Sequence, residues 1–118
     1  MSSNGKFDIK NLKRAWESGD VSQLMANYAE GFKQTEMDAS TPPSNPRLRT
    51  RQQFADVVES GLARGAKMTL SNLVPGQKQA AYGFSCLMPS GVKMVGNTIL
   101  ELKNGKIIKD TTVQVLDK

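Results

Sequence analysis

The sequence contains no histidine and only one cysteine, Cys86. Histidine is the usual acid–base side chain near neutral pH and the commonest metal ligand in proteins. Its absence excludes a catalytic triad built on histidine, and a single cysteine excludes a disulfide within the chain. Any proton transfer therefore falls to Asp, Glu, Tyr, Lys or Cys, and we expect no metal and no cofactor.

Long apolar runs and nucleotide-binding motifs are also missing. No apolar stretch approaches the ~18 residues that a membrane helix requires. Residues 1–6 are polar and lack the apolar core of a signal peptide. No glycine-rich phosphate loop is present. We therefore expect a cytoplasmic protein without membrane contact.

What the chain does have is an ordinary globular composition with a basic balance. It has 118 residues, of which 38% are hydrophobic and 23% charged, and a net charge of +5. This length fits one domain over residues 1–118. The densest basic group is Arg47, Arg49 and Arg51, without aromatic residues between them. Because the other basic residues are scattered, a solvated basic surface is favoured over nucleic-acid or anion binding by these arginines.

Three helices are expected in the first half of the chain. Asp8 and Gly19 are start and stop signals for a helix over residues 9–18. Asp20 starts a second helix, whose apolar stripe includes Tyr28 and which Gly31 stops. A third helix begins after Thr50 and ends before Gly65. The apolar residues that it is expected to bury are Phe54, Val57, Val58 and Leu62.

Strands are expected between the second and third helices and throughout the last third of the chain. Residues 32–38 predict a short strand, and the proline-containing residues 39–49 predict a loop. Further strands are expected over 67–74, 79–88, 92–103 and 106–116, the last with Ile107, Thr111, Val113 and Val115 on one face. This order predicts an α+β fold, with three N-terminal helices packed on a curved, largely antiparallel sheet.

Two short motifs resemble the SnoaL-like branch of the nuclear-transport-factor-two-like superfamily. Residues 16–20 (WESGD), Leu24 and residues 28–32 (YAEGF) are similar to its W-x-x-G-D, L and Y-A-x-x-F opening. Residues 101–107 (ELKNGKI) are similar to its C-terminal hairpin. The resemblance covers nearly the whole chain and implies a cone-shaped, cystatin-like α+β roll around an apolar pocket. Since the superfamily includes isomerases, polyketide cyclases, dehydratases and non-catalytic members, it implies no single reaction.

Three carboxylates are candidates for acid–base chemistry. The resemblance places Glu36 where ketosteroid isomerases carry a catalytic aspartate, and Asp110 where some SnoaL-like cyclases carry an acid. Asp38 is expected to share the strand face of Glu36. Desolvation on the wall of an apolar pocket raises the pKa of a carboxyl, which suits proton transfer beside a carbonyl. A solvated surface position is the alternative for each of the three.

A substrate site is expected to include aromatic and hydrogen-bonding side chains. The isomerase pattern is incomplete, because Leu12 stands where the resemblance implies an oxyanion-hole tyrosine, and Asn97 or Thr98 stands where it implies a second acid. Steroid isomerisation by that mechanism is therefore disfavoured. The expected substrate-binding residues are Trp16, Tyr28, Gln34, Phe54, Tyr82, Asn97 and Thr98.

Two functions remain open from the sequence. The first is an enzyme that transfers a proton, without a cofactor, on a small apolar carbonyl or cyclic substrate, as an isomerase, cyclase or dehydratase. The alternative is a non-catalytic domain that binds a ligand or a partner, because members of the superfamily often form homodimers through the exposed face of the sheet. The polar side chains of Gln34, Glu36 and Asp38 favour the enzyme, and the incomplete isomerase pattern favours the alternative.

Overall fold

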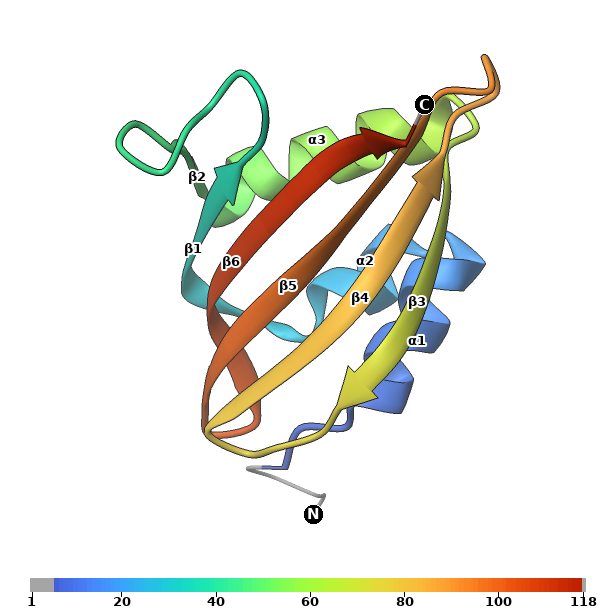
Figure 1. The fold of residues 1–118 in the computed structure, drawn as a ribbon. Helices are drawn as coiled ribbons and strands as arrows, with labels where there is room; N and C mark the ends of the chain where they lie inside the picture. The colour runs from blue at the N-terminus through green and yellow to red at the C-terminus, as the bar shows by residue number, and fades with distance from the viewer. Residues whose placement is uncertain (1–5, 118) are drawn as a thin grey trace.

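A computed structural model describes residues 6–117, and within them three helices pack on one face of a six-stranded sheet (Figure 1). The helices are α1 (Ile9–Ser18), α2 (Val21–Met25) and α3 (Arg51–Ala63). The strands are β1 (Tyr28–Met37), β2 (Arg47–Thr50), β3 (Lys67–Val74), β4 (Gln79–Leu87), β5 (Lys93–Lys103) and β6 (Lys106–Asp117). The α+β architecture predicted from the sequence is confirmed.

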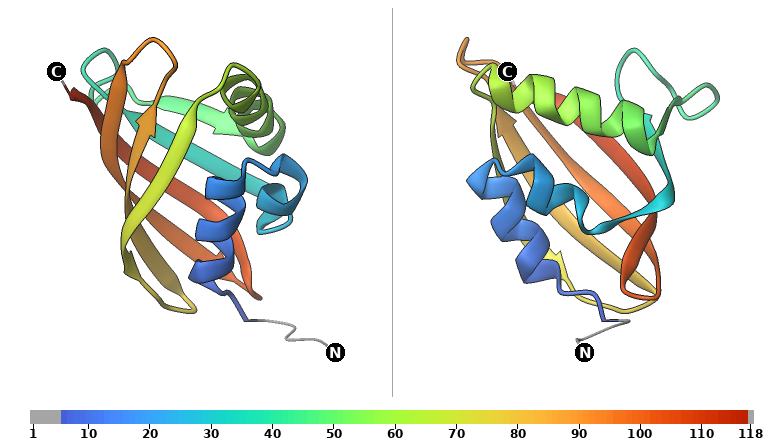
Figure 2. Two further views of the ribbon diagram at one scale, coloured as in Figure 1. Left: turned by 90° about the vertical axis from the view of Figure 1, so that its right-hand side faces the viewer. Right: turned by 180° about the vertical axis from the view of Figure 1, so that it is seen from behind.

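The sheet has the strand order β2-β1-β6-β5-β4-β3. Only β1 and β6 run parallel; the other neighbouring strands are antiparallel. The β1–β6 pairing brings residues 28–37 beside the last strand of the chain. The sheet curves around its helical side, where α3 crosses the upper part of the inner face and α1 lies along the lower part (Figure 2).

Each of the three helices begins directly after the capping residue that the sequence predicted for it. The carboxylate of Asp8 accepts a hydrogen bond from the backbone of Lys10, and that of Asp20 accepts one from Gln23. Thr50 and Gln53 form a reciprocal capping box at the start of α3. These contacts satisfy backbone N–H groups that a helix start leaves without partners.

The second helix is shorter than the sequence predicted, and Tyr28 is not part of it. The side-chain amide of Asn27 donates to the carbonyl oxygens of Gln23 and Leu24, which ends α2. The Asn27 carbonyl then accepts from the backbone of Ile107, and Tyr28 pairs with Ile107 as the first residue of β1. Pairing with β6 therefore outweighs the local helical pattern.

Part of the predicted loop over residues 39–49 is also strand. Residues Arg47–Thr50 form β2, an edge strand that pairs with residues 33–36 of β1. The prolines at 42, 43 and 46 precede this strand and do not interrupt its pairing.

The prediction that Ile107, Val113 and Val115 share one face of the last strand is wrong, because β6 contains a β-bulge. Leu102 of β5 pairs with Ile107, whereas Glu101 pairs with Lys109, so Ile108 is an extra residue. Because side chains alternate along a strand, the extra residue reverses the faces that follow it. Ile107 is completely buried, but Val113 and Val115 are exposed on the outer face.

The core lies between the helices and the inner face of the sheet. Phe32 is completely buried, with its ring centroid 4.7 Å from Tyr28 and 5.1 Å from Phe54. Val57 of α3, which was expected in the core, is half exposed. No helix within residues 6–117 is long and apolar enough to cross a membrane.

Candidate active site

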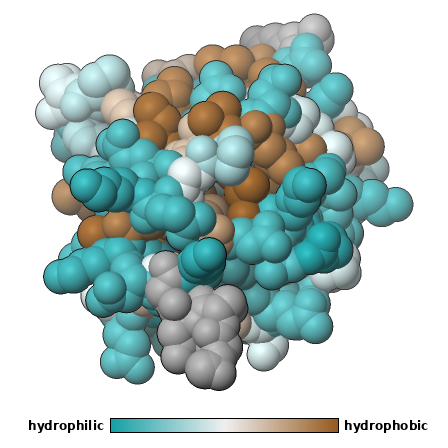
Figure 3. Space-filling model, turned by 90° about the horizontal axis from the view of Figure 1, so that it is seen from below, coloured by the Kyte–Doolittle hydropathy of each residue, from teal (hydrophilic) through white to brown (hydrophobic). Residues whose placement is uncertain are grey.

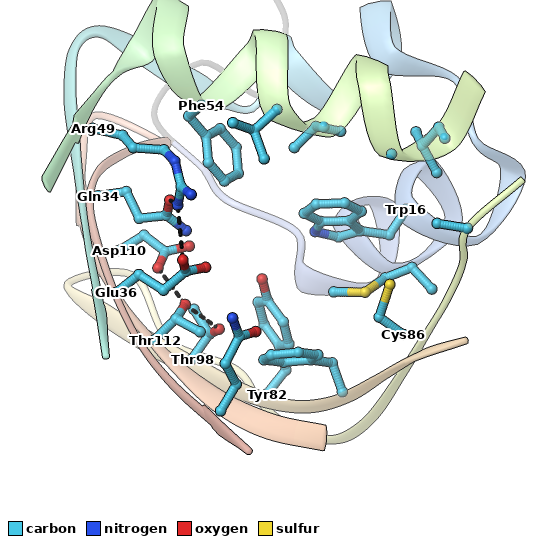
Figure 4. A pocket seen from close by; sticks show the side chains of 18 of the residues that line it. Trp16, Gln34, Glu36, Arg49, Phe54, Tyr82, Cys86, Thr98, Asp110 and Thr112 are labelled. Carbon is cyan, nitrogen blue, oxygen red and sulfur yellow. Dashed lines mark hydrogen bonds and ion pairs between the residues drawn. The ribbon is translucent and has the colours of Figure 1, made fainter. Parts of the chain in front are cut away.

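A cavity of about 200 Å³ opens between α3 and the inner face of the sheet. Its walls differ in polarity (Figure 4). The apolar wall includes Trp16, Phe54, Val58, Leu62, Phe84 and Met88. The polar wall comprises Gln34, Glu36, Arg49, Tyr82, Thr98, Asp110 and Thr112. This separation suits a ligand that is mostly apolar and carries a polar group at one side.

Five of the seven residues of the polar wall come from the three neighbouring strands β1, β6 and β5. In the parallel pairing of β1 with β6, Gln34 lies opposite Asp110 and Glu36 lies opposite Thr112. In the antiparallel pairing of β5 with β6, Thr98 lies opposite Thr112. All five side chains are on the inner face and are buried. Alternation along each strand therefore gathers residues from distant parts of the sequence.

Asp110 is the most deeply buried carboxyl of this wall, with an exposed fraction of 2%. The hydroxyl of Thr112 donates to its Oδ1 at 2.6 Å, and the hydroxyls of Thr112 and Thr98 lie 2.8 Å apart. Burial raises the pKa of Asp110 to about 7, although hydrogen bonds from Thr112 and Gln34 favour its charged form. The charge of Glu36 adds to the increase, and Arg49 opposes it.

The phenol of Tyr82 points into the cavity on the same side (Figure 4). Burial, followed by the charge of Asp110, raises the pKa of Tyr82 well above its usual range. A hydrogen bond with Thr98 opposes this increase. The phenol therefore stays protonated near neutral pH, where it can donate a hydrogen bond to a ligand oxygen.

Glu36 lines the cavity too, but two guanidinium groups engage its carboxylate. Its Oε1 accepts hydrogen bonds from Arg47 at 2.6 Å and from Arg49 at 3.0 Å. The same nitrogen of Arg49 also donates to the side chain of Gln34 at 2.9 Å. Edge strand β2 supplies both arginines, so its pairing with β1 completes this network. Glu36 is therefore held as one partner of a charge network and not as a free carboxylate.

The apolar wall carries a buried donor that lacks a partner. The indole Nε1 of Trp16 makes no hydrogen bond within residues 6–117, and neither does the hydroxyl of Tyr28. Burial, then the nearby Tyr82 and Asp110, raise the pKa of Tyr28 well above its usual range. Cys86, also on this wall, has a pKa raised by burial, as expected for an inert thiol.

Three residues expected at the site lie elsewhere. Asp38 follows β1, where its carboxylate accepts hydrogen bonds from Ser40 and Thr41. These bonds, Ser40 first, hold the pKa of Asp38 below its usual range. Asn97 is exposed on the outer face, because Thr98 takes the inward position. Tyr28 is buried beneath the cavity, against Phe32 and Phe54, and does not line it.

The arginines once considered for anion binding are engaged with the protein itself. Arg47 and Arg49 pair with Glu36. Arg51 donates to the backbone carbonyls of Met25 and Tyr28, which end α2 and begin β1. These contacts within the chain disfavour an RNA- or anion-binding surface built from these three residues.

Sequence reasoning missed two members of the polar wall, Arg49 and Thr112. The position of Arg49 at the site was not predicted, because residues 39–49 were expected to form a loop and not a strand beside β1. The alternation of Asp110, Thr112 and Gln114 was a usable signal for Thr112, but the bulge obscured which face it occupied. Within residues 6–117, no group of three Cys, Asp or Glu side chains is arranged to hold a metal ion.

Solved structures share this fold, although no protein-family model matches the sequence and no curated protein matches it significantly. An NTF2-like protein of unknown function from Mesorhizobium loti has a TM-score of 0.74 and 14% identity, over 90% of this chain and 86% of that one. A candidate ketosteroid isomerase from Kribbella flavida has a TM-score of 0.69 and 15% identity, over 90% and 73%. IdmH, a candidate polyketide cyclase from Streptomyces antibioticus, has a TM-score of 0.67 and 21% identity, over 90% and 88%. Such low identities establish a shared fold and no shared reaction.

Proposed function

Because the chain has the NTF2-like fold, we propose that it binds a small, mostly apolar molecule with an oxygen function and moves a proton on it without a cofactor. The observation that carries this proposal is Asp110, a buried carboxyl with a pKa of about 7 on the wall of an apolar cavity. A group with a pKa near the ambient pH is available both as a base and as an acid.

In the proposed mechanism Tyr82 binds the oxygen of the substrate and Asp110 transfers the proton. The phenol of Tyr82 donates a hydrogen bond to the carbonyl oxygen of the substrate. The carboxylate of Asp110 removes a proton from the carbon beside that carbonyl, and the electron pair of the broken C–H bond forms the enolate, which Tyr82 stabilises. Neutral Asp110 then returns the proton to another carbon or to a leaving oxygen. These two outcomes correspond to isomerase and dehydratase chemistry. In a cyclase the enolate carbon attacks a second carbonyl carbon of the substrate, and neutral Asp110 gives its proton to the alkoxide oxygen that forms.

Glu36 acts as a positioning residue in this proposal. Its Oε1 accepts hydrogen bonds from Arg47 and Arg49, so its carboxylate holds these two arginines in place. Through Arg49 it also fixes Gln34, which faces Asp110. Glu36→Gln is therefore expected to disturb the geometry of the polar wall but to preserve the dependence of activity on a group that titrates near pH 7.

Exchange of hydrogen for deuterium beside a ketone measures this proton transfer without knowledge of the natural substrate. We expect wild-type protein in D2O to exchange the α-hydrogens of cyclohexanone faster than buffer, with a rate that rises with pH through about 7. Asp110→Asn is expected to lower the protein-dependent rate by roughly a hundredfold or more. Asp56→Asn, at an exposed position of α3, is the matched control and should leave it unchanged.

The result that contradicts catalysis is binding without exchange. If cyclohexanone binds in the cavity and wild-type exchange does not exceed that of buffer, the non-catalytic ligand-binding alternative is favoured. Equal exchange rates for the wild type and Asp110→Asn would reject Asp110 as the acid–base group.

The outer face of the sheet supports a second part of the proposal, a homodimer. Ile99, Val113 and Val115 are each about half exposed there. These three side chains form the apolar centre of the face. The charged residues beside it pair within the chain, Lys93 with Asp117 and Lys109 with Glu101. An apolar, uncharged centre suits contact with the same face of a second copy. Figure 3 views the molecule from its lower end, where apolar side chains lie among mostly polar ones.

Analytical ultracentrifugation tests the homodimer. We expect the wild type to sediment as a dimer and Val113→Lys as a monomer, because the lysine places an unpaired charge in the interface. Lys33→Glu, a charge change on the exposed edge of this face, should leave the dimer intact. A monomeric wild type at micromolar concentration would reject this part of the proposal.

A further inference from the structure

The size of the cavity limits how much of a ligand it can enclose. Its volume is about 200 Å³. An engineered cavity of roughly 150 Å³ holds benzene, whereas sites for drug-sized ligands span roughly 300–1,000 Å³. The enclosed space therefore accommodates one six-membered ring with its oxygen function. A larger ligand must extend out of the cavity.

The polar wall decides which end of the ligand enters first. Asp110 and Thr98 are each only 2% exposed, so this wall is the closed end of the cavity. Val57 of α3 also lines the cavity but is 49% exposed, which marks the mouth. A ligand that places its oxygen at the closed end directs its remaining atoms past α3 at the mouth.

Gly61 lies at this mouth, one helical turn beyond Val57 on the same side of α3. A Cβ atom built on Gly61 would meet only the Cβ of Ala66, at 4.0 Å. Neither packing nor a left-handed backbone requires glycine here. Gly96 is different, because a Cβ there would lie 2.3 Å from the carbonyl oxygen of Val113 and 2.9 Å from the ring of Phe84.

We infer that Gly61 is a specificity-determining residue that leaves an exit at the mouth for a substituent on the ring of the ligand. The missing side chain creates open space at the rim of a cavity that encloses only one ring. The ligand class is therefore a monocyclic compound whose oxygen faces Asp110 and whose apolar chain leaves over Gly61. This inference deepens the proposed function and rests on it for the orientation of the ligand.

Two ketones of different length test the exit. Cyclohexanone fits within the cavity, whereas 4-pentylcyclohexanone carries a chain that must leave it. We expect Gly61→Leu to change the dissociation constant of cyclohexanone less than twofold, measured by ligand-observed NMR titration. The same variant should weaken 4-pentylcyclohexanone about tenfold, the effect of roughly two methylene groups that lose their burial.

Ser60→Leu is the matched control, because it adds the same side chain at an exposed neighbouring position outside the cavity lining. It should leave both dissociation constants unchanged. Gly61→Ala keeps the test available if the leucine variant does not fold, and it should weaken only the longer ketone, by about twofold. Thermal unfolding of each variant verifies that the fold is retained.

The outcomes separate this inference from the proposed function. Equal effects of Gly61→Leu on the two ketones, or no effect on either, would overturn the exit at Gly61. The α-hydrogen exchange of cyclohexanone would still test Asp110 in that case. If neither ketone binds the wild type, both the exit and the proposed ligand class are rejected.

Discussion

Replacing Asp110 by asparagine is expected to make the stability of the protein less sensitive to pH. The asparagine side chain has nearly the shape of aspartate, and its oxygen can still accept the hydrogen bond from Thr112. It cannot ionise. The substitution therefore removes one property of the site, the cost of placing a carboxylate in a buried environment.

The sign follows from the two pKa values of Asp110. Burial raises the pKa from 3.8 to about 7 in the folded protein. Well below pH 3.8 the carboxyl is largely protonated in both the folded and the unfolded state, and burial costs little. Between pH 4 and 7 the unfolded state releases the proton while the folded state retains it, so stability falls as pH rises. Above pH 7 the full cost applies.

The magnitude follows from the same shift. At about 1.4 kcal/mol for each pKa unit, an increase from 3.8 to about 7 corresponds to about 4 kcal/mol. This value is an upper limit, because a folded protein relaxes around a buried charge. It is nevertheless large beside the ~5–15 kcal/mol by which a domain is stable. We therefore expect Asp110→Asn to gain up to about 4 kcal/mol over the wild type between pH 4 and pH 8.

Urea unfolding followed by fluorescence of Trp16, the only tryptophan, measures this difference. The free energy of unfolding is determined for the wild type and for Asp110→Asn at pH 4, 6 and 8. Asp56→Asn, which changes an exposed carboxylate, should follow the wild type within about 0.5 kcal/mol at each pH. A difference between the wild type and Asp110→Asn that stays constant from pH 4 to pH 8 would refute the raised pKa and with it the proposed acid–base role.

Two further predictions concern the scaffold that positions the site. Thr50→Ala should lower the free energy of unfolding by about 1 kcal/mol, because it removes the capping box at the start of α3; Thr50→Ser should retain most of it in the same urea assay. Glu17→Ala should cost about 1–2 kcal/mol, because the Glu17 carboxylate accepts from the backbone N–H of Leu70 on edge strand β3 at 2.9 Å. Glu17→Gln keeps an acceptor and should lose less, and equal losses for the two variants would contradict this role.

Much of the scaffold could be predicted from local sequence signals. Asp8, Asp20 and Thr50 each start a helix, and β3 has the bounds predicted from its alternation. These features succeed because helix caps and strand alternation depend on residues only a few positions apart. The short α2 and the strand β2 were missed because strand pairing decides both: α2 ends where Tyr28 pairs with the distant β6, and β2 forms by pairing with β1 across the intervening loop.

The candidate site was predicted only in part for the same reason. Alternation predicted that Gln34 and Glu36 share one face of their strand, and only the structure shows that this face turns inward. The arginines that engage Glu36 belong to β2, and no local pattern reveals that this strand pairs with β1. The choice between Asn97 and Thr98 required the position of β5 in the sheet, which places Thr98 inside.

The sequence by itself determined that any acid–base chemistry rests on side chains other than histidine, and that the chain forms an α+β fold. Only the tertiary structure decided that Asp110 lies in the cavity. The bulge at Ile108 shifts the alternation of β6 by one residue, which turns Asp110 inward and Val113 outward. A side-chain period of two makes such a shift reverse every following residue, and the pairing with β1, which places Asp110 opposite Gln34, joins segments far apart in the chain.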